Sequence, residues 1–509
     1  MMNNKPSRIA VADLSGSFCR KALALAACLH ACAALAASPA SSPASWPDTP
    51  AGRLGSELIR RLDTDTPAQI RQWAPTVLSP AVGEDDRAGF LKGLASAVRD
   101  AGGVELLDVR PGRQPGSLVL AVKGRRAGQR AVFVLAADPA QPGKLAQMDL
   151  MPLGDPALYA DWPKAAVPRA ALARLVRATL DRLTHTSSFS GCVTVFDGSE
   201  TVLDECRGLA ERNFGVAVDR QTKFHIGSMD KMFTAVAIAQ LVEAGKLSWD
   251  TTLAQTVPEY PDPEAARKIT VWQLLHHTAG LGDFFVPEFF QHREKFVDPA
   301  DYLDLIARQP KVGEPGKDWN YSNAGYVLLG RIVEKLSGEG YFDYVQRHVF
   351  AAAGMDSSGF DSQEDVTPKL AVGYFHEGPF STDWKANWMS LPFKGSPAGG
   401  GYATNADLLR FAAALRVGRL VKPATLANMF DGAVPAGPGA YAAGFGERLS
   451  NGRHIRGHAG GAPGMSADLA MVWETGAAVA VTSNEGDSPT ALMLAEHIAD
   501  LLAADAQRP

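Results

Sequence analysis

The sequence is poor in the features that mark several large classes of protein. Charged residues make up 21% of its 509 residues and the formal net charge is -5, so the chain lacks the basic excess of a nucleic-acid-binding surface. Apolar residues make up 46%, which is the composition of a folded protein and not of a disordered one. We therefore expect a globular protein that does not bind nucleic acid.

Several catalytic and cofactor motifs are also missing. The sequence has no G-x-S-x-G, which argues against an α/β-hydrolase, and no P-loop or G-x-G-x-x-G phosphate cradle. It has no H-E-x-x-H or paired C-x-x-C zinc signature, and the adjacent His276 and His277 would diverge on a helix instead of facing one metal ion. We expect no metal and no other cofactor.

The chain has no apolar run of the roughly 20 residues that a membrane-spanning helix needs. A shorter run, ALALAACLHACAALAA, follows Arg20 and Lys21, and its Ala-Leu-Ala end offers the small residues of a signal-peptidase site. This pattern predicts a signal peptide at residues 1–36 and a secreted or periplasmic protein. The segment LAAC, ending at Cys28, also resembles a lipoprotein box, but only six apolar residues precede that cysteine, so lipid anchoring is the less favoured interpretation.

Cysteine is scarce, and only two of the five cysteines lie beyond the predicted signal peptide. Cys192 and Cys206 belong to SGCVTVFDGSETVLDECRG, which is typical of two strands joined at a turn beginning with Asp197 and Gly198. A three-residue loop at 198–200 would place the cysteines opposite each other. Two interpretations remain open at this level, a cross-strand disulfide and two small buried hydrophobic side chains.

The chain is long enough for two folded units. Residues 51–150 begin with helical sequence (57–63 and 87–103) and end in four strand-like runs, which predicts a small α+β domain with an antiparallel sheet and no evident chemistry. Six prolines lie between 139 and 168, so we place a domain boundary late in that segment.

Residues 168–505 have strand-like sequence near both ends and mostly helical or loop sequence between them. A helix from 169 leads into the cysteine hairpin, and MSADLAMVW, AAVAVTSN and a closing helix follow after 464. This order predicts a mixed α/β (α+β) domain in which one antiparallel sheet is built from both termini, with a helical region inserted. A cleft between the sheet and the insertion is a natural ligand site.

The segment FHIGSMDKMFTAVAIAQLV predicts a helix that is apolar on nearly every side. Ser228 and Lys231 are three residues apart, so they share a face, and burial of this helix would lower the pKa of the lysine enough for it to accept a proton. The alternative is that Ser228 only caps the helix while Lys231 reaches solvent from its first turn. Asp230 would project away from the shared face, and we interpret it as structural.

Two further short motifs follow. Tyr321-Ser322-Asn323 precedes an amphipathic helix, where the tyrosine could simply be buried and Asn323 could be the N-cap. RGHAGGAPGM places His458, Gly460 and Gly461 beside a predicted strand, where a glycine-rich turn with an incidental histidine is the alternative.

Taken in order, S-x-x-K, Y-S-N and H-x-G resemble the motifs of the serine β-lactamase-like superfamily. Within it they are similar to the branch of class C β-lactamases, D-stereospecific peptidases and related esterases. LLHHTAGL, AGGGYATNADLLRF and GHAGGAPGM also look like stretches of this branch, so the resemblance covers about residues 168–505. It implies a β-lactamase/transpeptidase-like fold and an acyl-enzyme mechanism.

The resemblance implies catalytic roles for three residues: Ser228 as the acylated nucleophile, Lys231 as the amine that helps to deprotonate it, and Tyr321 as the phenolic general base. A neighbouring ammonium would lower the pKa of that phenol.

Four further residues are expected on the substrate side. They are Asn323, His458, Gly460 and Gly461, with the backbone N–H groups of Ser228 and Gly461 forming an oxyanion hole.

We therefore expect an exported serine hydrolase that acts on an amide or ester of a small molecule or peptide. His458 stands where β-lactamases usually carry lysine, and a neutral imidazole anchors a substrate carboxylate less well, so efficient β-lactam hydrolysis is not expected. The alternative is a slowly acylating penicillin-binding protein or a sensor of peptidoglycan fragments. The aromatic segments 284–296 and 376–389 are expected to be loops or short helices, either over the cleft or packed beneath loops. The sequence does not indicate an oligomeric state.

Overall fold

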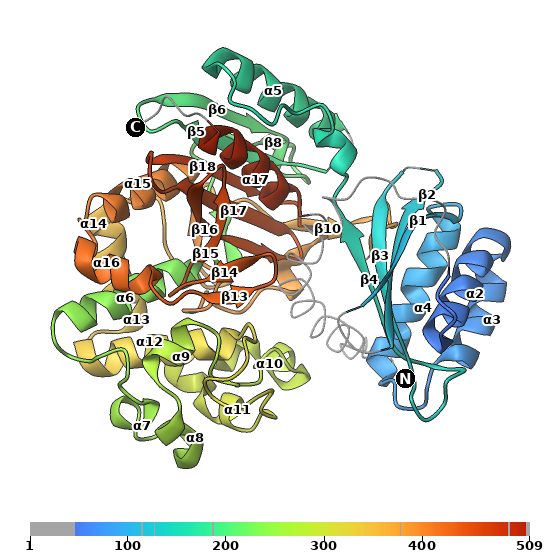
Figure 1. The fold of residues 1–509 in the computed structure, drawn as a ribbon, viewed down its shortest axis with the longest axis horizontal. Helices are drawn as coiled ribbons and strands as arrows, with labels where there is room; N and C mark the ends of the chain where they lie inside the picture. The colour runs from blue at the N-terminus through green and yellow to red at the C-terminus, as the bar shows by residue number, and fades with distance from the viewer. Residues whose placement is uncertain are drawn as a thin grey trace, which may run out of the picture.

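The computed structural model describes residues 46–504 except 113–115, 127, 186–187, 377 and 487–488. The predicted signal peptide at 1–36 lies outside the described residues. The fold is mixed α/β, as the sequence predicted. None of the helices within the described part of the chain combines the length and the apolar character that a membrane span requires. Figure 1 shows a small blue-to-teal layer of helices and sheet beside a larger body.

The small layer is an antiparallel sheet of order β1-β2-β3-β4 with three helices packed on one face (Figure 1). The four predicted strands are all present. A helix that the sequence analysis passed over begins at Pro67, where Thr66 and Gln69 form a reciprocal capping box. The elements are α2 (Pro50–Thr64), α3 (Pro67–Val77), α4 (Glu84–Arg99), β1 (Val104–Pro111), β2 (Ser117–Gly124), β3 (Arg130–Ala137) and β4 (Leu145–Leu153).

Two contacts join this layer to the rest of the chain. Residues 154–168 lead from β4 to the next helix, and Tyr159 and Trp162 in this segment are buried in a core of the larger body. In the opposite direction, Phe380 belongs to the larger body but is fully buried in the core of the small layer. Its ring lies against Gly124 at the end of β2.

The larger body is built on an eight-stranded antiparallel sheet of order β13-β14-β15-β16-β17-β18-β5-β6. Strands from the two ends of this region meet where β18 pairs with β5, so the prediction of one sheet built from both termini is confirmed. The strands are β5 (Gly191–Phe196), β6 (Thr201–Arg207), β13 (Val434–Ala436), β14 (Gly439–Tyr441), β15 (Gly446–Ser450), β16 (Arg453–Ala462), β17 (Met465–Val472) and β18 (Ala477–Ser483).

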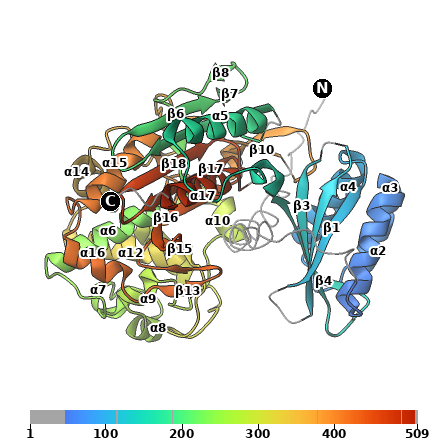
Figure 2. The same cartoon turned by 45° about the horizontal axis from the view of Figure 1, so that its top comes forward.

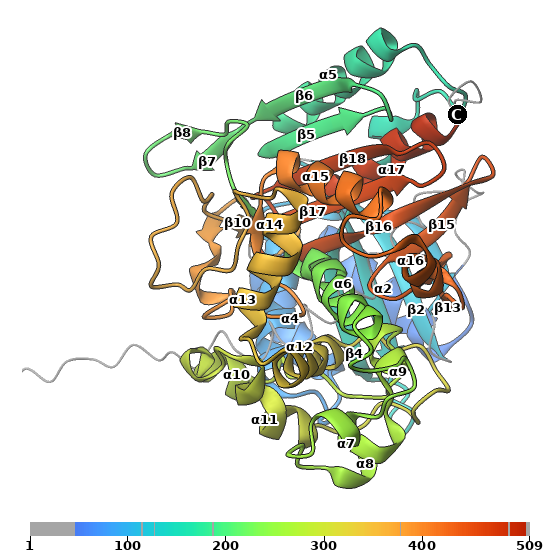
Figure 3. The same cartoon turned by 90° about the vertical axis from the view of Figure 1, so that its left-hand side faces the viewer.

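Helices cover both faces of this sheet (Figure 2). α5 (Arg169–His185) and α17 (Thr490–Ala503) pack on one face, because alternate strand residues such as Val479 and Val481 point toward them. The other face contacts the inserted region, in which α6 (Asp230–Glu243) and α12 (Asn323–Ser337) lie against each other (Figure 3). α6 is apolar all round, which explains its place in the centre of the largest core.

The remaining helices of the insertion are short. They are η3 (Gly227–Met229), α7 (Leu253–Thr256), α8 (Pro263–Lys268), α9 (Val271–Leu275), α10 (Pro287–Gln291), η4 (Arg293–Lys295), η5 (Pro299–Tyr302), α11 (Leu303–Ala307), α13 (Tyr341–Val345), η6 (Gln346–Phe350), α14 (Ala351–Ala353), η7 (Asn387–Met389), α15 (Asn405–Arg416) and α16 (Pro423–Phe430). One more short helix, η2 (Pro156–Tyr159), precedes α5.

Short strands complete the structure. They are β7 (Leu209–Glu211), β8 (Val216–Ala217), β9 (Phe224–His225), β10 (Tyr374–His376), β11 (Trp384–Ala386) and β12 (Tyr402–Ala403). The expectation of loops or short helices for 376–389 is therefore partly wrong: β10 and β11 form a hairpin before η7. Its aromatic Phe380 packs under the small layer and not over the cleft, because that layer supplies the nearest apolar core.

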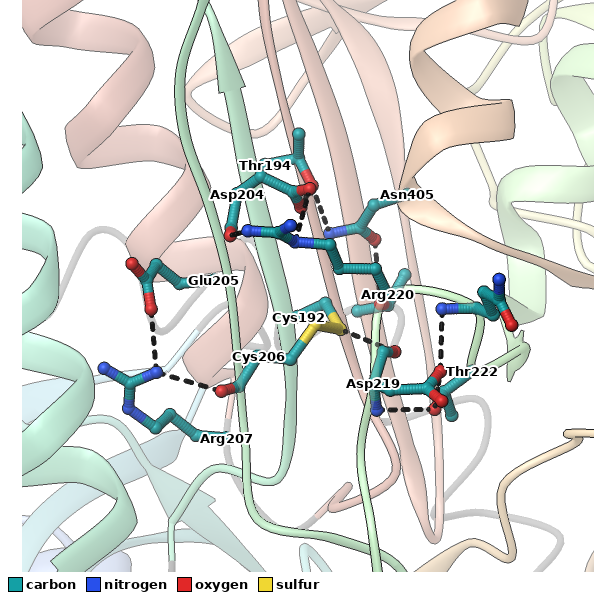
Figure 4. The surroundings of a disulfide bond; sticks show 12 residues. Cys192, Thr194, Asp204, Glu205, Cys206, Arg207, Asp219, Arg220, Thr222 and Asn405 are labelled. Carbon is teal, nitrogen blue, oxygen red and sulfur yellow. Dashed lines mark hydrogen bonds and ion pairs between the residues drawn. A yellow bond between two sulfur atoms is a disulfide. The ribbon is translucent and has the colours of Figure 1, made fainter.

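The two cysteines beyond the predicted signal peptide form a disulfide (Figure 4). Cys192 on β5 and Cys206 on β6 are direct register partners, with Cα atoms 4.1 Å apart. Of the two interpretations left open by the sequence, the structure has the cross-strand bond. The disulfide links the edge strand β6 of the large sheet to its neighbour β5.

Candidate active site

Ser228 lies in the single turn η3 that immediately precedes α6. No side chain caps the start of α6, so the interpretation of Ser228 as a simple cap is wrong. The backbone of Gly227 has φ 53°, a left-handed conformation that glycine adopts without strain. This turn presses the chain around Ser228 against strand β16.

Lys231 is fully buried in the first turn of α6. Its Nζ donates hydrogen bonds to Asn323 Oδ1 at 2.8 Å and to the carbonyl oxygen of Ala398 at 2.5 Å. Burial lowers the pKa of Lys231 to about 7, which confirms the expected desolvation and excludes a lysine that reaches solvent. The amine is thus available in its neutral form near neutral pH.

Tyr321 is brought from a distant segment to the same place. Its hydroxyl lies close enough to the Ser228 side chain for the serine to lower its pKa slightly, and its ring centroid lies 4.8 Å from Lys231 Nζ. The expectation that the phenol would have a lowered pKa is wrong: burial dominates and raises the pKa of Tyr321 above its ordinary value. Tyr321 is therefore a neutral phenol at neutral pH, with both the serine and the amine beside it.

Asn323 is the first residue of α12 and not its N-cap. Ser322 caps the helix instead, by accepting a hydrogen bond from the N–H of Gly325. The Asn323 side chain bridges two ionisable groups, because its Oδ1 accepts from Lys231 and its Nδ2 donates to Asp283 Oδ2 at 2.8 Å. Asp283 was not predicted as a site residue; its only signal in the sequence is an acid two residues after the LLHHTAGL segment.

His458 lies on β16 at the same cluster, with its ring centroid 6.4 Å from that of Tyr321. Its Nε2 is 2.9 Å from the hydroxyl of Tyr441, a buried residue at the end of β14 that sequence reasoning also missed. No local pattern marks Tyr441, because its partner is 17 residues away on a different strand.

The two predicted glycines of β16 meet the turn around Ser228. A Cβ built on Gly460 would lie 1.8 Å from the carbonyl oxygen of Ile226 and 3.1 Å from the N of Ser228, so only glycine permits this approach. A Cβ on Gly227 would lie 3.0 Å from the N of Gly461. The structure thus brings the N–H-bearing backbone of Ser228 and Gly461 into the same small space.

His276 and His277 diverge, as the sequence analysis expected. His276 stacks on Trp272, whereas His277 has φ 58° and packs its ring 4.4 Å from that of Tyr321. The Nδ1 of His277 accepts a hydrogen bond from the N–H of Ser322, which steadies the segment that carries Tyr321. Within the described ranges no group of three or more histidine, cysteine or acidic side chains is arranged to hold a metal ion.

Asp230 is buried on another side of α6. Its Oδ2 accepts a hydrogen bond from the N–H of Gly401 at 2.6 Å, and burial raises the pKa of its carboxyl to about 8. This contact fixes the glycine-rich loop that also carries Ala398, whose carbonyl oxygen accepts from Lys231. Asp230 therefore contacts the loop that holds Ala398 and Gly401, and it does not contact Ser228.

A cavity of about 280 Å³ opens at these residues. Ser228, Tyr321, Asn323 and His458 line it, together with aromatic residues from segment 284–296. That segment forms α10 and η4, as expected. Its aromatic residues occupy both of the expected positions. Phe284 and Phe289 are buried against Tyr302 in the core, whereas Phe285 and Phe290 are only partly buried beside the cavity. Together, these four phenylalanines and Tyr302 form one apolar wall of the cavity.

Comparison with known proteins identifies the family of the larger body. The family model described as Beta-lactamase matches residues 172–503. The chain belongs to the Beta-lactamase family. Members of this family are serine hydrolases, and they include penicillin-binding proteins, amidases and esterases.

Individual relatives are distant. The chain is 30% identical to the putative penicillin-binding protein PbpX of Bacillus subtilis over 259 residues, covering 50% of this chain and 62% of that protein. It is 27% identical to the esterase EstB of Burkholderia gladioli, covering 51% of this chain and 74% of the esterase. The matches span 40% to 62% of the length of the first three curated relatives.

Solved structures of this family share the fold. A penicillin-binding protein from Bacillus halodurans superposes with a TM-score of 0.56 and 29% identity, covering 62% of this chain and 98% of that one. The D-amino acid amidase of Ochrobactrum anthropi superposes with a TM-score of 0.57 at 24% identity, covering 65% of this chain and 98% of the amidase. The latter likeness shows the fold alone.

Proposed function

We propose that this protein is an exported serine hydrolase that cleaves an amide or ester through an acyl-enzyme formed on Ser228. The observation that carries the proposal is that Ser228 and Tyr321 line one cavity beside Lys231, a buried lysine with a lowered pKa whose Nζ lies 4.8 Å from the Tyr321 ring. A serine hydroxyl is a weak nucleophile until a neighbouring base accepts its proton. The neutral amine of Lys231 is such a base.

In the proposed acylation step, Ser228 Oγ attacks the carbonyl carbon of the substrate and loses its proton toward Tyr321. Because the pKa of Tyr321 is raised, a stable phenolate is disfavoured, and we assign Tyr321 to relay the proton to Lys231. The relayed proton then leaves with the amine or alcohol of the substrate. In the second step water attacks the carbonyl carbon of the acyl-enzyme, the same groups pass a proton from this water to Ser228 Oγ, and the acid product is released.

The backbone supplies the second part of the proposed mechanism. The N–H groups of Ser228 and Gly461 would bind the oxyanion of the tetrahedral intermediate, and one such donor contributes about 2.7 to 4 kcal/mol to the transition state. The close approach of Gly460 to Ile226 is what allows these two backbones to converge. Asn323 and His458 line the cavity, and we assign them to the substrate side.

The test is acylation and turnover by the purified protein and its Ser228→Ala variant. We expect the wild type to hydrolyse one or more of a panel of p-nitrophenyl esters, D-amino-acid amides and a chromogenic cephalosporin, with the cephalosporin the poorest. Ser228→Ala should lose turnover and labelling by a fluorophosphonate probe. Ser248→Ala, an exposed serine bonded to Thr251, is the matched control. Wild-type turnover in Ser228→Ala would refute the proposal.

The second candidate function is a slowly acylating penicillin-binding or peptidoglycan-sensing protein. It is favoured by the names of the first three curated relatives, which are all penicillin-binding proteins. Pre-steady-state kinetics separates the two functions. A burst of one product per chain without further turnover identifies the slow acylator, whereas continued turnover identifies the hydrolase.

Export and the division of the chain are part of the proposal. The predicted signal peptide at 1–36 and the Cys192–Cys206 disulfide both fit an oxidising compartment. We assign residues 51–150 to an accessory domain and 168–505 to the hydrolase domain. N-terminal sequencing of the protein recovered from the periplasm or medium tests the export and the cleavage near residue 36.

A further inference from the structure

The cavity at Ser228 continues past strand β16 to a second compartment. Its lining includes not only the serine and the aromatic wall but also Asp468 on β17 and Glu496 on α17. These acids lie on the opposite side of the sheet from His458. In the register of β16 and β17, His458 pairs with Leu469 while Ala459 pairs with Asp468, and adjacent strand residues point to opposite faces.

Small residues keep this compartment open. Gly457, Ala459 and Gly461 alternate along β16 on the face that Asp468 shares, and all three line the cavity. A Cβ on Gly457 would lie 1.7 Å from the carbonyl oxygen of Leu469, so only glycine fits there, and a side chain larger than that of Ala459 would enter the space beside Asp468. The second compartment is here defined by these three residues together with Asp468 and Glu496.

Asp468 is 5% exposed, yet its carboxyl receives no hydrogen bond from any residue that the structure describes. Buried carboxyl groups ordinarily have donors or a counter-charge, since an unsatisfied one costs free energy. Burial raises the pKa of Asp468, and the neighbouring Glu496 raises it further. Burial likewise raises the pKa of Glu496.

The neighbouring cation, Arg448, makes its hydrogen bonds to other groups. Arg448 on β15 donates from one nitrogen to Asp500 at 2.6 Å and from another to the carbonyl oxygen of Glu496 at 3.1 Å. Arg448 also lines this cavity and lowers the pKa of both acids, but neither carboxyl receives one of its hydrogen bonds. The compartment, which is joined to the cavity that contains Ser228, therefore has two carboxyl groups with one nearby arginine and no hydrogen-bond donor among the described residues.

We propose that this second compartment binds a cationic group of the substrate, namely a primary ammonium, while the reacting carbonyl lies at Ser228. The inference rests on the proposed function only for the position of the carbonyl. An ammonium offers three donors to two carboxylates that have none, and opposite charge within about 4 to 6 Å favours ionised carboxylates. The preferred substrate class is thus an amide or ester that also carries an amine.

The experiment compares two matched esters, p-nitrophenyl hexanoate and p-nitrophenyl 6-aminohexanoate, in wild type and in Asp468→Asn. We expect kcat/KM to favour the amino ester in the wild type. Asp468→Asn should lower kcat/KM for the amino ester by about tenfold to a hundredfold, the effect of losing one hydrogen bond to a charged group, and change the neutral ester less than threefold. Asp181→Asn, an exposed acid on α5, is the control.

A binding measurement separates this inference from the proposed function. Hexylammonium is titrated calorimetrically into Ser228→Ala and into Ser228→Ala with Asp468→Asn or Glu496→Gln. Weaker binding in the two double variants supports the cation site even if no ester is hydrolysed. Equal binding in all three proteins, no binding at all, or equal loss of both esters in Asp468→Asn would overturn it.

Discussion

The core beneath the small sheet β1–β4 and the core around α6 differ in the ionisable side chains that they bury. Among the described residues of the first, the buried polar side chains are three serines, Ser79, Ser96 and Ser117, and none is ionisable. The second buries Asp230, Lys231 and His277 completely or nearly so. Burying an ionisable group costs free energy that apolar packing must offset. The first core thus contains only groups whose burial is cheap in free energy. The second core is less stable than an all-apolar one would be, because it buries groups that can gain or lose a proton.

The largest expected effect is on turnover. Lys231→Met should lower kcat/KM by about 10³-fold, within the range of general base catalysis, because no other buried amine faces Tyr321 among the described residues. Its unfolding temperature should change little, since the lost hydrogen bonds to Asn323 and Ala398 offset the removed cost of burying an amine. Ester hydrolysis and calorimetry measure both. Lys246→Met, on an exposed lysine, is the control; a Lys231→Met protein with full activity would contradict the assignment.

The converse change is expected in the small layer. Leu120 on β2 is fully buried, so Leu120→Ala should lower the free energy of unfolding by about 2–5 kcal/mol. The activity per folded molecule should remain at the wild-type level, because Leu120 is not near Ser228. Urea denaturation and active-site titration of the folded fraction test this. Loss of specific activity in the folded fraction would show that the two cores are not functionally separate.

The pH dependence of the rate gives a smaller effect. With the pKa of Lys231 lowered to about 7, the neutral amine is the majority form above that pH and is lost below it. We expect kcat/KM to fall by up to tenfold per pH unit below about pH 7 and to level off above it. A pH–rate profile between 5 and 9 measures this. A flat profile across pH 7 would rule out the lysine as the titrating base.

The smallest expected effect is on the pH dependence of stability. The pKa of Asp230 is raised to about 8 in the folded state from about 3.9 in an unfolded chain, so the folded protein binds the extra proton and its stability falls as pH rises through this window. Lys231, with its lowered pKa, contributes the opposite trend only above about pH 7.

Between pH 5 and 7 the two contributions are therefore separable. Asp230→Asn keeps an acceptor for Gly401 but does not ionise, so its free energy of unfolding should vary less steeply than that of the wild type, by about 1 kcal/mol per pH unit. Denaturant titrations at pH 5, 6 and 7 provide the comparison. Parallel curves would mean that Asp230 does not titrate in this range.

The sequence predicted those parts of the molecule whose signals are local. Ser228 and Lys231 are three residues apart, and the helix after them is apolar on every side, so their burial follows from the residues themselves. The strands of the small sheet and β5, β6, β17 and β18 of the large one were also predicted, because most are short apolar runs bounded by turn residues. β13, β14 and β15 were not predicted, and β13 and β14 lie in a region expected to be helical or loop. α3 was passed over although Thr66 and Gln69 carried a capping-box signal.

The remaining features depend on contacts between distant segments. Asp283 and Tyr441 complete the surroundings of Asn323 and His458, but neither belongs to a motif. The direction of the pKa shift of Tyr321 could not be predicted from its neighbours in sequence, because it is set by burial in the folded protein. Asp468 was visible in the sequence as the one acid in the mostly apolar run MSADLAMV. The face of the sheet on which it lies could be assigned only from the register of β17.

Phe380, at the turn between β10 and β11, has a practical consequence. Its ring is enclosed by side chains that come from the blue and teal elements of Figure 1. An expressed fragment that starts at α5 would leave this aromatic ring facing water, where it invites aggregation. Anyone dividing the gene to study the hydrolase alone should replace that phenylalanine with a polar residue first.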